Sequence, residues 1–209
     1  MKTTRTFTAL SILFVTCLLV SNVLACKMIS VWVLTLPAAV IIFPISYIVN
    51  DAISELYGFQ KAKFTIYAGF IMNAIMVLAF TIASVIPAPV WWGNQEAFEA
   101  ILGNTGRVLL ASFIAYLVGS LLNSKVMVAM RDRAQNGKGL FLRCITSTLV
   151  GETVDACIFI SIAFFGTMDG KSLLTMIVSQ AAFKVVYEII IYPITRIVIG
   201  KLKEAENVE

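Results

Sequence analysis

Long apolar segments dominate this chain and leave it few folds other than a bundle of helices that cross a membrane. A helix needs about 20 apolar residues to span a hydrocarbon core roughly 30 Å thick, and several segments approach or exceed that length. Only 13% of the 209 residues are charged and 59% are hydrophobic, whereas a soluble domain is about 25% charged. The sequence therefore predicts one all-α, polytopic membrane domain over residues 1–209.

Six membrane-spanning helices are predicted, with approximate ranges 7–26, 31–57, 64–86, 107–128, 142–165 and 173–199. The first segment ends at Cys26 and also imitates a cleaved secretory signal. Because Asn22 interrupts its apolar stretch and further spans follow, we expect a retained first helix. In the second segment, Pro37 suits a first helical turn, whereas Pro44 is expected to kink the helix.

The basic residues are distributed unevenly between the two sides of this six-helix arrangement. With a cytoplasmic N-terminus, twelve of the sixteen Lys and Arg residues fall in cytoplasmic segments: Lys2, Arg5, Lys61, Lys63, Lys125, Arg131, Arg133, Lys138, Arg143, Arg196, Lys201 and Lys203. Lys27, Arg107 and Lys171 fall outside, and Lys184 lies within the last span. Because positive residues are concentrated on the cytoplasmic side of membrane proteins, this asymmetry predicts that both termini are cytoplasmic.

Two local patterns concern helix packing and membrane depth. Ala111, Ala115 and Gly119 recur every four residues in the fourth span, which allows close approach of another helix. The pair Trp91 and Trp92 follows the third span, and adjacent tryptophans beside a membrane helix are typical of the headgroup level. We therefore expect a packed fourth helix and an interfacial connection before it.

A polar group interrupts the end of the second span. Tyr47, Asp51 and Glu55 are spaced four residues apart, so they share one face of a helix. One interpretation is that the two acids lie just beyond the membrane and are solvated. The other is that they face the bundle interior or a wet cavity, as intramembrane acids usually do. The spacing alone leaves both interpretations open.

A second polar group lies deeper. Asp155 is about twelve residues into the fifth span and Lys184 about eleven into the sixth, so both fall near the membrane midplane. Glu152 shares a helix face with Asp155, as Glu188 does with Lys184. A structural ion pair is one interpretation. The other interpretation is a central polar binding cavity, because two acids for one cation leave negative charge that the pair does not need. Further polar residues available to this cavity are Asn22, Tyr47 and Thr148.

Residue types argue against several other functions. The chain has no histidine, which excludes common catalytic zinc sites and histidine-based triads. An intramembrane aspartyl protease would need two midplane aspartates, but Asp51 is off-centre and no Gly-x-Gly precedes Asp155. Without Cys-x-x-Cys spacing, Cys17, Cys26, Cys144 and Cys157 are interpreted as small hydrophobes. We expect a non-enzyme with no cofactor or metal and, in the absence of basic runs, no nucleic-acid partner.

Residues along nearly the whole chain resemble the queuosine precursor transporter family, which is sometimes grouped with vitamin uptake transporters. They are Ser21-Asn22, Lys27, Phe43-Pro44, Tyr47, Asp51, Glu55, Tyr57-Gly58, Arg107, Ala111-Ser112, Ala115-Tyr116, Ser147-Thr148-Leu149, Gly151, Asp155, Ala163-Phe164, Phe183-Lys184 and Pro193. The chain departs from the family pattern at Ser120 and Asn123, where a Gln and an Asp are expected. It also departs at Glu152, where an amide is common.

The resemblance implies a multi-pass importer in the bacterial inner membrane that carries 7-deazaguanine bases for the salvage of queuosine in tRNA. The residues that we expect to bind this substrate are Asn22, Phe43, Tyr47, Asp51, Glu55, Thr148, Glu152, Asp155 and Lys184. Asp155 or Glu152 suits the guanine-like edge, whose adjacent N–H donors one carboxylate can accept. Asp51 or Glu55 suits an amine or a coupling proton, and Tyr47 or Phe43 can stack on the ring.

An alternative is the substrate-binding subunit of a vitamin importer driven by a separate ATPase module. The chain's size and six expected helices fit that class. Its usual docking signature, two alanines four residues apart early in the first helix, is missing here, although Ala79 with Ala83 and Ala111 with Ala115 occur elsewhere. The sequence leaves open whether the protein is a homodimer and which energy source it uses.

Overall fold

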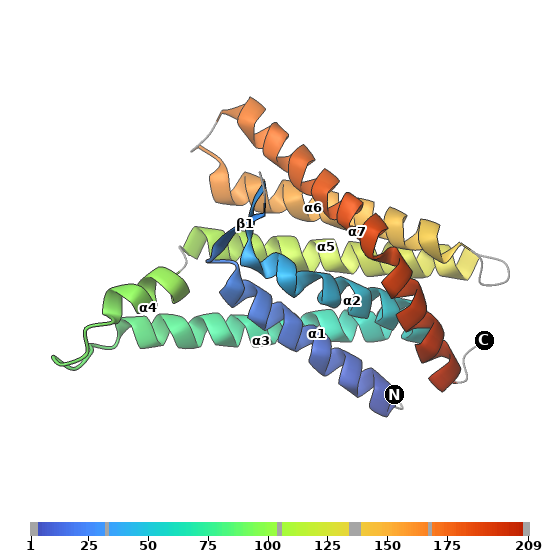
Figure 1. The fold of residues 1–209 in the computed structure, drawn as a ribbon, viewed down its shortest axis with the longest axis horizontal. Helices are drawn as coiled ribbons and strands as arrows, with labels where there is room; N and C mark the ends of the chain where they lie inside the picture. Colours follow the sequence, from blue (N-terminus) through green and yellow to red (C-terminus); the bar gives the residue numbers. More distant parts are fainter. Residues whose placement is uncertain (1–3, 32–33, 104–105, 134–138, 167–168, 207–209) are drawn as a thin grey trace.

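The computed structural model describes residues 4–31, 34–103, 106–133, 139–166 and 169–206, and their architecture is a bundle of long helices (Figure 1). The all-α class predicted from the sequence is confirmed, apart from one small hairpin. In order, the elements are α1 (Arg5–Leu24), β1 (Met28–Val31), β2 (Leu34–Pro37), the 3-10 helix η1 (Ala38–Ile41), α2 (Phe43–Tyr57), α3 (Phe59–Val85), α4 (Gln95–Leu102), α5 (Gly106–Arg133), α6 (Leu140–Phe164) and α7 (Gly170–Glu206).

Within the described part of the chain, five helices are long and apolar enough to cross a membrane. They span Arg5–Leu24, Phe59–Val85, Leu110–Arg133, Leu140–Phe164 and Gly170–Glu204. These helices correspond to the first, third, fourth, fifth and sixth predicted spans. Their exposed surfaces are apolar: Ile71, Ile75, Leu78 and Ile82 form one exposed row along α3. Such a surface is suited to lipid, so a multi-pass membrane protein is the architecture that the helices support.

The second predicted span, 31–57, is wrong before Phe43. Met28 pairs with Pro37 and Val31 with Leu34 in an antiparallel hairpin, so the helix begins only at Phe43. Pro44 lies in the first turn of α2 rather than inside a helix. There its missing N–H costs nothing, so the predicted kink is also wrong. With 15 residues, α2 is about 22 Å long and is too short to span the core alone.

The short helix α2 lies inside the bundle rather than at its surface. It contacts α1, α3, α5 and α7, and Figure 1 shows it beside α1 and α5. Val49 and Ile53 of α2 pack with Phe7 and Phe14 of α1 and Ile66 of α3 in one apolar cluster. Because neighbouring helices surround α2, its polar residues Asp51 and Glu55 are buried as well as its apolar ones.

Helices α5 and α6 form the most extensive helix contact in the bundle. A Cβ atom placed on Gly119 would lie 2.8 Å from Cβ of Asp155 and 2.9 Å from the carbonyl oxygen of Gly151. One placed on Gly151 would lie 2.7 Å from Cβ of Asn123. The two glycines therefore permit an approach that no larger residue allows, which confirms the close packing predicted for the fourth span.

The first and last helices, α1 and α7, have their outer ends at the same end of the bundle (Figure 1). The start of α1 and the end of α7 lie at the end of the bundle where α5 ends and α6 begins, whereas α4 lies at the opposite end (Figure 1). At that opposite end the carboxylate of Asp169 accepts hydrogen bonds from the side chain and backbone of Ser172 and from the backbone of Lys171. These bonds hold the pKa of Asp169 below its usual range and cap the start of α7.

The glycine contact gives a direct test of the packing. We expect Gly119→Ala to destabilise the protein by about 1–3 kcal/mol, because the added methyl group overlaps backbone atoms of α6. Gly200→Ala in α7 is the matched control, since nothing lies within 4 Å of its Cβ position. Thermal unfolding in detergent should show a lower melting temperature for the first variant only. Equal melting temperatures for the two variants would contradict the close approach.

Candidate functional site

The polar face of α2 meets α6 and α7 at three successive levels. Tyr47, Asp51 and Glu55 lie one turn apart on this face, and each contacts a different set of residues on the other two helices. The first level is the lysine cluster of Tyr47, Glu152, Asp155 and Lys184. The second is the carboxylate cluster of Asp51, Cys144 and Glu188. The third is the arginine cluster of Glu55, Arg143 and Lys203.

In the lysine cluster, the ammonium group of Lys184 on α7 donates to two carboxylates on α6. One is Glu152, and the other is Asp155 at 2.8 Å. Tyr47 of α2 forms a side-chain hydrogen bond with Glu152. The Lys184 side chain is 13% exposed and that of Asp155 is 20% exposed, so these two side chains are less enclosed than Asp51 and Glu55, which are 1% and 3% exposed.

In the carboxylate cluster, Asp51 and Glu188 are 1% and 2% exposed. One carboxylate oxygen of each and the sulfur of Cys144 all lie within 4.8 Å of one another. The amide of Asn123 on α5 donates to Oδ1 of Asp51 at 3.1 Å. Among the described residues, neither carboxylate forms an ion pair with Lys or Arg. Two acids and a thiol thus occupy a buried position between α2, α6 and α7.

In the arginine cluster, Oε1 of Glu55 accepts from Arg143 at 2.7 Å and from Lys203 at 3.2 Å. Both partners of the first pair are almost fully buried, with side chains 1% and 2% exposed. Arg131 of α5 donates to the backbone oxygen of Glu55 at 2.7 Å. A cavity of about 400 Å³ opens beside Glu55, Arg143, Arg196 and Lys203.

Charge changes sign along the three clusters. The lysine cluster combines one cation with two acids, and the arginine cluster combines two cations with one acid. The carboxylate cluster contains two acids that have no basic partner in the described part of the chain. A graded row of buried charges on neighbouring helices is typical of a route for an ion or a polar solute through a membrane. It would be an expensive arrangement for packing alone.

Burial decides the question that the spacing of Asp51 and Glu55 left open. The two side chains are 1% and 3% exposed, so the interpretation that they are solvated beyond the membrane is wrong. Three of the remaining candidates, Glu152, Asp155 and Lys184, meet Tyr47 as the lysine cluster. The predicted contact between Lys184 and acids of the fifth predicted span is therefore confirmed.

The other candidates are placed differently. Thr148 is buried on α6, one turn from Cys144 and one turn from Glu152. Asn22 lies elsewhere, where its amide donates to Asn73 of α3 at 2.7 Å. The side chain of Phe43 lies outside the described part of the structure. The cavity beside Glu55 also differs from the central cavity that the sequence predicted around Lys184.

Sequence reasoning missed several residues that complete these clusters. In the sequence Glu188 shares a helix face with Lys184, but this spacing does not reveal that it meets Asp51. Cys144 was interpreted as a small hydrophobe, and Arg143 was counted only as a basic residue of a cytoplasmic segment. Asn123 was noted as a departure from a family pattern. No periodicity could have joined these residues, because they come from three different helices.

Comparison with known proteins identifies relatives of the chain. Residues 37–198 match the family described as "Putative vitamin uptake transporter". A "Probable queuosine precursor transporter" of Bacillus subtilis (strain 168) is 27% identical over 176 residues, which cover 83% of this chain and 76% of that protein. The "Queuosine precursor transporter" of Escherichia coli (strain K12) is 28% identical over 130 residues, 61% of this chain and 54% of that protein. No solved structure matches the chain.

The arginine cluster gives a stability test that is independent of function. We expect Arg143→Met to destabilise the protein by about 3–5 kcal/mol, because it leaves the buried Glu55 with one of its two cationic partners. The matched control is Asp132→Asn, which breaks an ion pair with Arg131 in which the acid is 61% exposed. Such an exposed pair contributes about 0–1 kcal/mol. Thermal unfolding should separate the two variants, and a similar small loss in both would contradict a buried ion pair at Glu55.

Proposed function

Because the chain belongs to the vitamin uptake transporter family, we propose that it imports queuosine precursors across the bacterial inner membrane for salvage into tRNA. The names of the Bacillus subtilis and Escherichia coli relatives support this proposal. The five helices of spanning length agree with a carrier embedded in a bilayer. The comparisons give no support to the alternative, a subunit of an ATPase-driven system.

The lysine cluster is the observation that carries the proposal. The hydrogen-bonding edge of a 7-deazaguanine offers adjacent N–H donors next to a carbonyl acceptor. A carboxylate accepts the adjacent donors in a bidentate manner, and an ammonium group donates to the carbonyl. Asp155 and Lys184, joined at 2.8 Å, carry this pair of groups. On binding, the substrate would exchange the contact between the two side chains for contacts with its own edge.

The remaining candidate residues are assigned by their positions around this cluster. Tyr47 and Glu152 lie beside Lys184 and would contact the base. Thr148 lies on α6 one turn before Glu152, between the lysine cluster and the carboxylate cluster. Asp51 would face a cationic substituent of the substrate or carry a coupling proton. Phe43, at the start of α2, would stack on the ring.

The cavity beside the arginine cluster would be the exit of this route. Its lining includes Leu140 at the start of α6 and Lys203 near the end of α7, the side that the distribution of basic residues predicts to be cytoplasmic. A solute that leaves the lysine cluster would pass Asp51 and then Glu55, whose ion pairs with Arg143 and Lys203 would separate to let it through. Because two cations hold Glu55, we propose that it gates the exit, and that Asn22, bonded to Asn73, acts nearer the opposite entrance.

The import function is tested in cells that cannot make queuosine precursors and lack an importer of their own. Supplied with 7-cyano- or 7-aminomethyl-7-deazaguanine, cells that express this chain should accumulate queuosine in their tRNA, whereas cells with an empty vector should not. Comparing the neutral cyano compound with the cationic aminomethyl compound also shows which substituent is preferred. Equal tRNA queuosine in both strains, with the protein present in the membrane, would refute the proposal.

The role of the lysine cluster is tested by neutralising its charges. We expect Asp155→Asn and Lys184→Met each to lower the initial uptake rate about tenfold or more, because each removes a charge-assisted hydrogen bond worth about 1.5–3 kcal/mol. Lys171→Met, which changes an exposed lysine of the same helix, is the matched control. Uptake must be divided by membrane abundance, since breaking a buried pair also destabilises. Near-normal rates in both cluster variants would reduce the pair to packing.

A further inference from the structure

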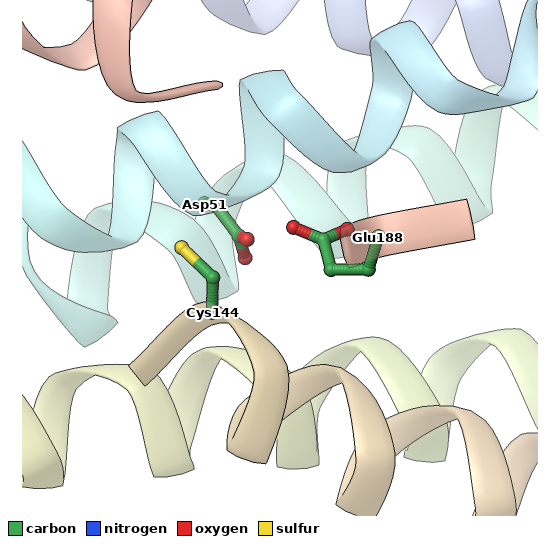
Figure 2. A group of neighbouring side chains, drawn as sticks. All are labelled: Asp51, Cys144 and Glu188. Carbon is green, nitrogen blue, oxygen red and sulfur yellow. The ribbon is translucent and has the colours of Figure 1, made fainter. Parts of the chain in front are cut away.

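Asp51 and Glu188 form a pair of buried carboxylates that face each other. In Figure 2 their carboxylate groups point toward one another from α2 and α7, with the thiol of Cys144 on α6 beside Asp51. The three ligand atoms lie within 4.8 Å of one another. All three residues are buried, Cys144 completely. Three helices thus direct electron-pair donors at one small buried volume.

This volume contains acceptors whose hydrogen bonds are not satisfied. Oδ2 of Asp51 and Oε1 of Glu188 are buried and have no hydrogen-bond partner in the described part of the chain. The bond from Asn123 reaches only Oδ1 of Asp51, and the hydrogen bond between Cys144 and Asp51 adds no positive charge. Buried acceptors that lack donors are rare in native proteins and point to a missing donor or cation.

The charged groups around the pair do not supply that cation. Lys184 of α7 pairs with Glu152 and Asp155 of α6. Arg143 of α6 and Lys203 of α7 both pair with Glu55 of α2. The titratable groups that interact electrostatically with the pair are Tyr47 and Glu55 from α2, Cys144 and Glu152 from α6, and Tyr187 from α7; α5 contributes the neutral Asn123. Two ionised carboxylates so close and so buried repel each other strongly.

We infer that the carboxylate cluster binds one small monovalent cation, a proton or a sodium ion, between Asp51 and Glu188. Either ion bridges two oxygens and removes the repulsion between them, and hard oxygen ligands suit both. An uncharged thiol at Cys144 tolerates this arrangement without competing for the ion. The inference concerns a bound ion only and holds whether or not the protein carries a deazaguanine.

The position of the cluster gives the ion a use in transport. Asp51 and Glu188 each lie four residues, about one turn, from Tyr47 and Lys184 of the lysine cluster. A cation that ties α2, α6 and α7 together therefore acts on the same helices that hold the lysine cluster. If the proposed import function is correct, the ion gradient drives uptake through this shared contact. This second step, unlike the site itself, rests on the proposed function.

The site is tested on the purified, full-length, substrate-free protein in detergent with EDTA, which removes divalent ions. Melting temperatures are compared in sodium chloride and in choline chloride of equal ionic strength, at about pH 6 and about pH 8. A sodium site raises the wild-type melting temperature by about 5 °C at the higher pH when sodium is in large excess. A proton site instead gives a higher melting temperature at the lower pH in choline, because stability from a bound proton is lost as the pH rises.

Two variants and a control make the outcome decisive. Glu188→Gln and Asp51→Asn should each abolish the response to the ion, and Glu188→Gln should fold well because it removes one of the repelling charges. Glu96→Gln, at an exposed acid of α4, should respond like the wild type. A wild-type response no larger than that of Glu188→Gln, to either sodium or protons, would overturn the inference. Because no substrate is present, that result would leave the import function to its own uptake test.

Discussion

Burial of the acidic face of α2 against α6 and α7 is the interaction on which the rest of this structure depends. Placing Asp51 and Glu55 in a membrane bundle is unfavourable unless other groups compensate their charge. Arg143 and Lys203 compensate Glu55, which fixes the ends of α6 and α7 relative to α2. Among the described residues, Asp51 receives hydrogen bonds only from an amide and a thiol, neither of which is a cation.

The unusual backbone of the bundle follows from this requirement. A helix of spanning length would carry its acids through the lipid core, whereas α2 is a 15-residue helix enclosed by its neighbours. The hairpin before it satisfies the backbone hydrogen bonds that a shortened helix would otherwise expose. Gly119 and Gly151 bring α5 against α6, which leaves Asp155 and Glu152 turned toward Lys184. The three clusters are thus consequences of helix packing around one short, polar helix.

Much of this fold is readable from the sequence, but less of the site is. A long apolar segment that crosses a membrane is stable as a helix, so the sequence predicts each of the five spanning helices. The pairing of Lys184 with Asp155 followed from depth and from the scarcity of buried charges. The hairpin at Met28–Pro37 was missed because an apolar run looks alike as a strand or as a helix. Glu188 was missed as a partner of Asp51 because contacts between helices leave no periodic signal within either one.

The central claim is that the polar face of α2, with α6 and α7, forms a binding site for a 7-deazaguanine. Equilibrium binding of radiolabelled 7-cyano-7-deazaguanine to the purified protein tests it most directly. The account predicts saturable binding to the wild type and binding about tenfold weaker or more to Asp155→Asn, which removes the charge of the carboxylate that pairs with Lys184. No saturable binding to a folded wild-type protein, or equal affinity in the variant, would contradict it.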